Sequence, residues 1–250
     1  MRYLITVSYD GTNYKGYQTQ PGLLTIQEQI ENALTKINNG KKTSFTSSGR
    51  TDRGVHAKMQ CGHADIDVNI TEYKLKRAMN SNLPDDIHVI KTEKVNSDFH
   101  ARYNVIEKTY EYYINIGEYN PIERNYVFQY NYPLNVEKMQ EAIKYLIGEH
   151  DFRSFVTENR EKENCIRTIS TATVEKTNQD IIKFTFTGNG FLRYQIRNMV
   201  GILIRIGEEK ESPEFVKIFL ERKDRSKGGK TAPAEGLYLT NIKYKDKETV

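Results

Sequence analysis

Two kinds of hydrophobic periodicity alternate along this sequence, and their order is the strongest constraint on its fold. Residues 3–9 carry apolar side chains at every second position, which is typical of a strand with one buried face. Residues 25–38 repeat apolar side chains every three or four positions, as an amphipathic helix does. Strands near residue 44, over 59–68 and over 87–95, and a helix over 71–79, complete the pattern. The first part of the chain therefore predicts the order strand, helix, strand, strand, helix, strand.

The first predicted helix also carries signals for both of its ends. Thr25 and Glu28 have the spacing of a capping box, in which the two side chains bond to backbone amides at the helix start. Gly40 follows the last apolar residue and is suited to end the helix. We therefore expect a helix from Thr25 to about Asn38.

The second part of the chain repeats the same order. Strands are predicted over 108–116, 168–176, 181–188 and 236–244, with a possible extra strand over 126–132. Asn135 can cap a helix whose apolar stripe is Val136, Met139, Ile143 and Leu146. A long helix is predicted over 191–206, and a shorter one begins at Ser212 and Pro213.

Both parts read β-α-β-β-α-β, which is the ferredoxin-like order. The chain is therefore predicted to be α+β, with two ferredoxin-like halves over 1–104 and 105–250. Such halves favour one extended, mainly antiparallel sheet with helices on one face, which leaves the other face open for a ligand. The halves share no obvious repeat of individual residues, so the duplication is one of pattern.

Composition excludes several classes of protein. Among 250 residues, 37% are hydrophobic and 28% charged, and no apolar run approaches the roughly 20 residues that span a bilayer. The N-terminal residues read as a strand and lack a signal-peptide cleavage site, so a cytoplasmic protein without membrane attachment is expected. Cys61 and Cys165 are expected to be free thiols. His56, Cys61 and His63 do not supply the four spaced ligands of a structural zinc site, so no metal is expected.

The basic residues are unevenly distributed. The formal net charge is only +4, but residues 41–58 and 222–230 each carry five basic residues and one acidic residue. Such clusters either contact phosphates or form solvated loops. Composition alone does not decide between the two.

The first cluster contains the stretch SSGRTDRGVHAK, in which Asp52 lies between Arg50 and Arg53. A carboxylate beside arginines can act as a nucleophile or a general base. The alternative is a plain turn over Asp52, Arg53 and Gly54. Read alone, the stretch favours the turn.

Four further stretches of the sequence favour the functional interpretation of Asp52 over the plain turn. They are YDGTNYKGYQTQ, which precedes GRTDRGVHA, and FHARYNVIEKTYEYY, GNGFLRYQIRNMVG and GGKTAPAEGLYL, which follow it, in order and at sensible spacing over almost the whole chain. Together the stretches resemble the tRNA pseudouridine synthase A family, whose signature GRTDxGVHA is complete from Gly49 to Ala57. The resemblance implies two ferredoxin-like halves with an active-site cleft between them. It also implies a homodimer without cofactor that isomerises uridine to pseudouridine in the anticodon stem-loop of tRNA.

The resemblance also assigns roles to individual residues. Asp52 corresponds to the catalytic aspartate, and Arg197 to the helix arginine that pairs with it. Tyr110 corresponds to the tyrosine that stacks on the flipped uracil, and Leu237 to an apolar wall of the uridine pocket. Arg50 corresponds to the arginine that fills the space left by the flipped base. The alternatives are a loop charge for Arg50, a surface helix arginine for Arg197, and core positions for Tyr110 and Leu237.

Backbone contacts to RNA are expected from the two basic clusters. The residues are Lys41, Lys42, Arg222, Lys223, Arg225, Lys227 and Lys230.

One departure from the family is visible, because Tyr17 stands where tryptophan is common. The sequence leaves open whether Asp52 attacks C1′ or removes the C2′ proton. A non-catalytic RNA-binding protein and a metal-dependent nuclease are the rival hypotheses, and the second needs clustered carboxylates that the signature lacks.

Overall fold

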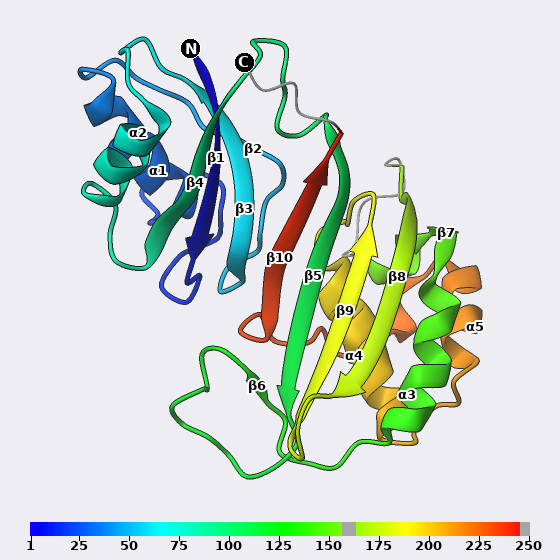
Figure 1. The fold of residues 1–250 in the computed structure, drawn as a ribbon. Coiled ribbons are helices and arrows are strands. Elements are labelled where there is room, and N and C mark those ends of the chain that lie inside the picture. The colour runs from blue at the N-terminus through cyan, green and yellow to red at the C-terminus, as the bar shows by residue number, and fades with distance from the viewer. Residues whose placement is uncertain (157–163, 246–250) are drawn as a thin grey trace. The chain divides into compact units, whose positions relative to one another are not determined.

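The computed structural model of the chain describes residues 1–156 and 164–245. This part of the chain forms two compact units, one of Met1–Ile106 with the C-terminal residues from Tyr238, and one of Glu107–Leu237. Its described residues contain ten strands and five α-helices, and most strand pairs are antiparallel. The predicted mixture of helices with mainly antiparallel strands is therefore confirmed (Figure 1).

The first unit is built around one central strand. Its elements are β1 (Arg2–Tyr9), α1 (Ile26–Ile37), β2 (Thr46–Ser47), β3 (His56–Asp65), α2 (Glu72–Asn80) and β4 (Ile87–Val95). Strand β1 pairs antiparallel with β3 and with β4, and its apolar side chains are fully buried. The C-terminal strand β10 (Leu237–Tyr244) joins β3 in parallel through Tyr238 and Leu239. Helices α1 and α2 lie together on one face of these strands (Figure 1).

Helix α1 forms where the apolar periodicity predicted it, but one of its end signals was wrong. Ile26, Ile30 and Leu34 are buried, as the helical spacing requires. Thr25 is the N-cap, yet its side chain makes no capping hydrogen bond, and its buried Oγ1 has no partner within the described residues. The predicted capping box is therefore not formed. The residue types and spacing of a capping box are present, but the spacing alone does not form the Thr25 hydrogen bond.

The second unit contains more elements than the sequence predicted. They are β5 (Val105–Asn115), β6 (Phe128–Gln129), α3 (Val136–Ile143), β7 (Gly148–Asp151), β8 (Ile166–Lys176), β9 (Ile181–Gly188), α4 (Gln195–Gly207) and α5 (Phe215–Arg222). Strand β9 pairs antiparallel with β5 and β8, and β7 extends the sheet beyond β8. The three helices cover one face of this sheet (Figure 1). Strand β7 was missed because GEHD has no strand periodicity, and the extra strand expected over 126–132 is only β6.

Two helix starts differ from the sequence prediction. Helix α4 begins at Gln195 rather than near Phe191, because Tyr194 has a left-handed backbone with φ 62° that cannot continue a helix. Gln195 closes this start with its own side chain, whose Oε1 accepts from the Leu192 amide at 2.8 Å. Helix α5 begins at Phe215, because Ser212 and Pro213 form the turn before it.

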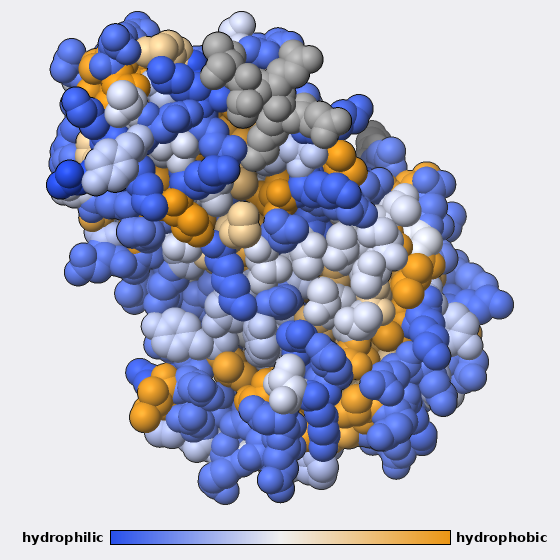
Figure 2. All heavy atoms as spheres, in the orientation of Figure 1, coloured by the Kyte–Doolittle hydropathy of each residue, from blue (hydrophilic) through white to orange (hydrophobic). Residues whose placement is uncertain are grey.

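The drawn surface is mostly hydrophilic, with hydrophobic side chains in small separate groups (Figure 2). Helix α4 is the most deeply buried helix, and within it only Arg197 and Arg205 keep partial exposure. Within residues 1–156 and 164–245, no helix has the length and apolar character needed to cross a bilayer.

Comparing Thr25 and Thr71, the N-cap residues of α1 and α2, tests whether the Thr25 side chain contributes to capping α1. Replacing Thr25 by valine removes a buried hydroxyl without a partner, and we expect the free energy of unfolding to rise by about 1 kcal/mol. Thr71 is the matched control, because its side chain accepts from the Lys74 amide at the start of α2. Thr71→Val should lower the free energy of unfolding by about 1 kcal/mol. Urea denaturation measures both, and a loss in both variants would contradict the assignment.

Candidate active site in the Asp52 turn

Asp52 lies at the start of a tight turn over residues 52–55. The Val55 amide donates to the Asp52 carbonyl oxygen at 3.2 Å. Gly54 has φ 77°, a left-handed conformation that costs a side-chain-bearing residue energy. Asp52 is half-buried, whereas Arg50 and Arg53 are exposed. The chain therefore forms the turn that the sequence predicted.

The segment before Asp52 is fixed by the side chain of Gln60, which is fully buried in β3. Its Oε1 accepts from the Ser48 hydroxyl at 2.7 Å and from the Cys61 amide at 3.1 Å. Its Nε2 donates to the Gly49 carbonyl oxygen at 3.0 Å. One carboxamide therefore links the loop to the strand that follows the turn.

Thr51 connects the turn to β1 and to the loop after it. Its Oγ1 is 2.8 Å from the Tyr9 hydroxyl, and its carbonyl accepts from the Tyr17 amide at 3.2 Å. The Tyr9 and Tyr17 rings pack against each other with centroids 6.2 Å apart. Burial raises the pKa of Tyr9 and of Tyr17 well above the ordinary value, so both remain neutral. Tyr17 thus packs against Tyr9 and the backbone of the turn.

The loop after β1 contacts the far side of the turn very closely. A Cβ on Gly11 would lie 2.1 Å from the Val55 carbonyl oxygen, so only glycine fits there. The Gly11 amide donates to Nδ1 of His56 at 3.1 Å. The turn is therefore enclosed between Gln60 on one side and the loop after β1 on the other.

His56 lies directly after the turn and makes contacts that the sequence did not predict, because it was weighed only as a metal ligand. Its ring is buried, with Nδ1 3.1 Å from Oδ1 of Asp10. It also stacks on Tyr238 with centroids 4.8 Å apart. Lys58 lies over the same tyrosine at 5.4 Å from the ring centroid. The signal that could have identified His56 is its place within GVHA, directly after the turn.

Arg197 has fixed partners within its own unit. Its Nε donates to the Ala232 carbonyl at 2.7 Å, and its guanidinium lies 5.2 Å from the centre of the Tyr194 ring. The Ala232 amide donates back to the Arg197 carbonyl at 3.0 Å. The side chain is half-buried. Asp52 belongs to the other unit, and its pairing with Arg197 stays a prediction.

Tyr110 and Leu237 are both buried within or beside the second unit's sheet. Tyr110 lies in β5 and packs edge to face on Phe191 with centroids 5.3 Å apart. The Leu237 amide donates to the Ala234 carbonyl at 2.9 Å as β10 begins. Their roles toward a uridine stay predictions.

The basic residues expected to contact RNA fall into different environments. Arg222, Lys223, Lys227, Lys230 and Lys42 are exposed. Arg225 instead turns inward, and its Nη2 donates to Asn198 Oδ1 and to the Gly229 carbonyl, both at 2.9 Å. Lys41 forms an ion pair with Asp67. Arg225 therefore anchors its own loop to α4.

Neither cysteine takes part in a disulfide, and both are buried thiols. Within the described part of the chain, no group of His, Cys, Asp and Glu side chains is arranged to hold a metal ion.

Comparison with known proteins identifies the family. The family model described as tRNA pseudouridine synthase matches residues 5–104 and 142–245. The tRNA pseudouridine synthase A of Streptococcus agalactiae serotype III (strain NEM316) is 44% identical over 249 residues, which cover 99% of this chain and 96% of that protein. That of Streptococcus uberis (strain ATCC BAA-854 / 0140J) is 45% identical, covering 98% of this chain and 99% of that protein.

These matches identify an RNA-modifying isomerase. The chain belongs to the tRNA pseudouridine synthase family. A solved structure entitled "Crystal Structure of a Cbf5-Nop10-Gar1 Complex" also overlaps 80% of this chain and 54% of its own, with a TM-score of 0.35 and 12% identity. That overlap is too low to support a conclusion.

Gln60 provides a test of how the turn is held. Gln60→Leu leaves the Ser48 hydroxyl and the Gly49 carbonyl buried without this partner, so the free energy of unfolding should fall by about 2–4 kcal/mol. Gln140→Leu is the control, because Gln140 makes one hydrogen bond, to the Val174 carbonyl, from an exposed position. The free energy of unfolding of Gln140→Leu should fall by less than about 1 kcal/mol. Equal losses in urea denaturation would show that the Gln60 contacts do not stabilise the turn.

Proposed function

We propose that this chain isomerises uridine to pseudouridine in the anticodon stem-loop of tRNA, with Asp52 as the catalytic residue. Family membership supplies the reaction class. The observation that supports Asp52 is its position on a turn held by Gln60, Thr51 and Gly11, while its own side chain stays half-buried. A carboxylate so held keeps its position when a nucleotide approaches, which is what a catalytic group requires.

The reaction suits a single carboxylate. The bond between N1 of uracil and C1′ breaks, and a bond between C5 and C1′ forms. C5 loses a proton and N1 gains one, so the atoms balance without a co-substrate. An ionised Asp52 either attacks C1′ or removes the C2′ proton to give a glycal. Both routes need the carboxylate ionised, which a guanidinium such as that of Arg197 favours.

The other site residues act on the flipped nucleotide. A base inside a stem must leave the stack before any enzyme can reach it. In this proposal Tyr110 stacks on the flipped uracil, Leu237 forms an apolar wall, and Arg50 occupies the vacated space. The edge contact between Tyr110 and Phe191 supports the first role, because it holds the ring in one orientation. The exposure of Arg50 supports the third.

The RNA backbone meets exposed lysines and arginines. Lys42, Arg222, Lys223, Lys227 and Lys230 are exposed and suited to phosphate contacts. Lys41 is also exposed and is proposed to contact phosphate, although it pairs with Asp67 in the free protein. Arg225 is proposed to contact phosphate as well, although its Nη2 bonds within its own loop and to Asn198.

The remaining expectations concern architecture and assembly. We propose two ferredoxin-like halves, 1–104 and 105–250, joined in one sheet with an active-site cleft between them. The order β1-α1-β2-β3-α2-β4 in the first half supports this, as does β5-α3-β8-β9-α4-β10 in the second, where β6, β7 and α5 are additions. A cytoplasmic homodimer acting on tRNA completes the proposal.

The central test is Asp52→Asn, which keeps the shape of the side chain and removes its charge. We expect pseudouridine formation in a tRNA transcript to fall by at least about a thousandfold, with tRNA binding nearly unchanged. Asp85→Asn is the matched control, because Asp85 is an exposed turn carboxylate of the same unit. Retained pseudouridine formation by Asp52→Asn would refute the proposal.

The turn itself can be tested through two glycines of similar conformation. Gly54 has φ 77° and Gly22 has φ 71°. Alanine at either position meets left-handed strain, so each variant should lose about 1–2 kcal/mol of unfolding free energy. Only Gly54→Ala displaces Asp52, and only it should lower the rate of pseudouridine formation, by about tenfold or more for a misplaced catalytic group. Equal rates of pseudouridine formation in the two variants would show that the conformation of the Asp52 turn does not matter for catalysis.

A further inference from the structure

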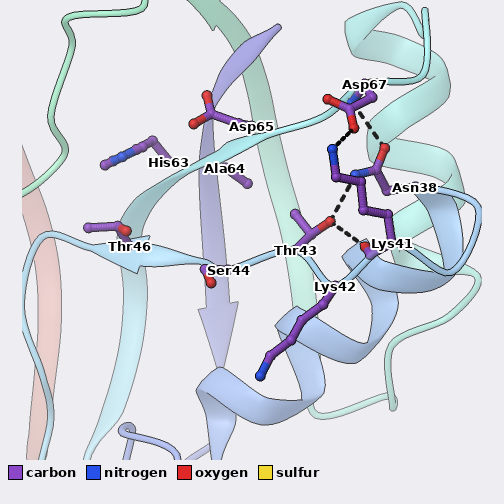
Figure 3. A pocket seen from close by; sticks show the side chains of 10 residues that line it. All are labelled: Asn38, Lys41, Lys42, Thr43, Ser44, Thr46, His63, Ala64, Asp65 and Asp67. Atoms are coloured by element: carbon purple, nitrogen blue, oxygen red, sulfur yellow. Dashed lines mark hydrogen bonds and ion pairs between the residues drawn. The ribbon is translucent and has the colours of Figure 1, made fainter.

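A polar pocket of about 250 Å³ opens in the first unit, between residues 41–46 and the end of β3 (Figure 3). His63, Asp65 and Asp67 line it from the β3 side, and Lys41 and Lys42 from the other side. The family signature ends at Ala57 and does not include these residues. Seven residues of β3, His56 to Gly62, lie between the Asp52 turn and His63, the first residue of the strand that lines the pocket, so the two lie roughly 20 Å apart.

The charges of this pocket leave a positive excess. The Asp65 carboxylate accepts hydrogen bonds from Nε and Nη2 of Arg2 at 2.9 and 2.8 Å. This pairing lowers the pKa of Asp65. Lys41 forms an ion pair with Asp67. Lys42 is exposed and has no ion partner among the described residues. With both carboxylates neutralised, the ammonium group of Lys42 can attract an anion such as a phosphate.

A column of rings extends from the pocket to the surface. His63 contacts the edge of His100 with centroids 4.9 Å apart, and His100 stacks on Tyr103 with centroids 4.2 Å apart. Tyr103 is 77% exposed, so one end of the column is open to solvent. Arg102, beside it, is also exposed.

Hydrogen bonds hold this column in place. Nδ1 of His63 accepts from the Ala101 amide at 3.1 Å, and Nδ1 of His100 accepts from the Arg102 amide at 3.2 Å. Burial and the nearby Arg2 lower the pKa of His63 to about 4, so its ring is neutral at neutral pH. The exposed Tyr103 ring therefore rests on a fixed aromatic base, which reduces the entropy lost when another ring stacks on it.

We propose that the pocket and the Tyr103 ring form a second contact with the tRNA substrate, distant from the target uridine. Tyr103 stacks on an unpaired base, and Lys42 and Arg102 contact phosphates, which is the combination that proteins use for unstacked RNA. This inference rests on the proposed function. Because roughly 20 Å separates the pocket from Asp52, the contacted nucleotide is not the target uridine, and in this proposal it lies outside the anticodon stem-loop.

The test compares the binding of two RNAs, a full-length tRNA transcript and the isolated anticodon stem-loop. We expect Tyr103→Ala to weaken binding of the full-length tRNA by about 5- to 100-fold, the effect of losing one base–aromatic stack, and to leave stem-loop binding unchanged. Tyr103→Phe keeps the ring and should bind both RNAs as the wild type does. Tyr73→Ala is the control, because Tyr73 is 68% exposed on α2 and is not among the residues that line the pocket.

Salt dependence tests the phosphate contact separately. Lys42→Ala should reduce the slope of log affinity against log salt by about 0.7–0.9 for full-length tRNA. Lys74→Ala, an exposed lysine of α2, should leave that slope unchanged.

Two results would overturn the second contact: full-length tRNA binding that is unaffected by Tyr103→Ala, or an equal loss for both RNAs. Pseudouridine formation is measured separately in the same preparations. Binding that changes as expected without any pseudouridine formation would contradict the proposed function alone, so the two failures are distinguishable.

Discussion

The buried carboxamide of Gln60 is the interaction on which the candidate site depends. Taking an amide out of water without partners costs several kcal/mol, so its hydrogen bonds must form together as the core closes. They join Ser48 and Gly49 to β3, which holds the segment just before Asp52 in one position. Strand β3 is in turn paired with the central strand β1. The position of the Asp52 turn is therefore fixed by the core of the first unit.

The pairing of β1 with β3 also brings two loops together. The loop after β1 begins where β3 begins, because the strands are antiparallel, and Gly11 consequently meets Val55. This contact places His56 against Asp10 and Gly11. Strand pairing and the two glycine-containing loops thus form one structural unit, in which a change at Gly11 or Gly54 reaches Asp52 through the backbone.

Much of the fold was predictable because strand and helix periodicity are local. The predicted strands over 87–95 and 181–188 match β4 and β9, and the predicted first helix matches α1. Predictions failed where one side chain or one backbone angle decided the outcome, as at Thr25, where the hydroxyl is buried, and at Tyr194, which has a left-handed backbone. Gln60 was missed because its partners, Ser48 and Gly49, lie on a different segment and meet it only in the folded chain.

The sequence alone determined the order of the elements, the family signature and the carboxylate at its centre. Only the tertiary structure decided which charged side chains find partners within the protein. Arg225 and Lys41 look equivalent to Lys42 in the sequence, yet one anchors a loop to α4 and the other pairs with Asp67. The reason is physical. Periodicity is set by neighbours a few positions apart, whereas the burial and pairing of a polar group depend on segments that meet only after folding.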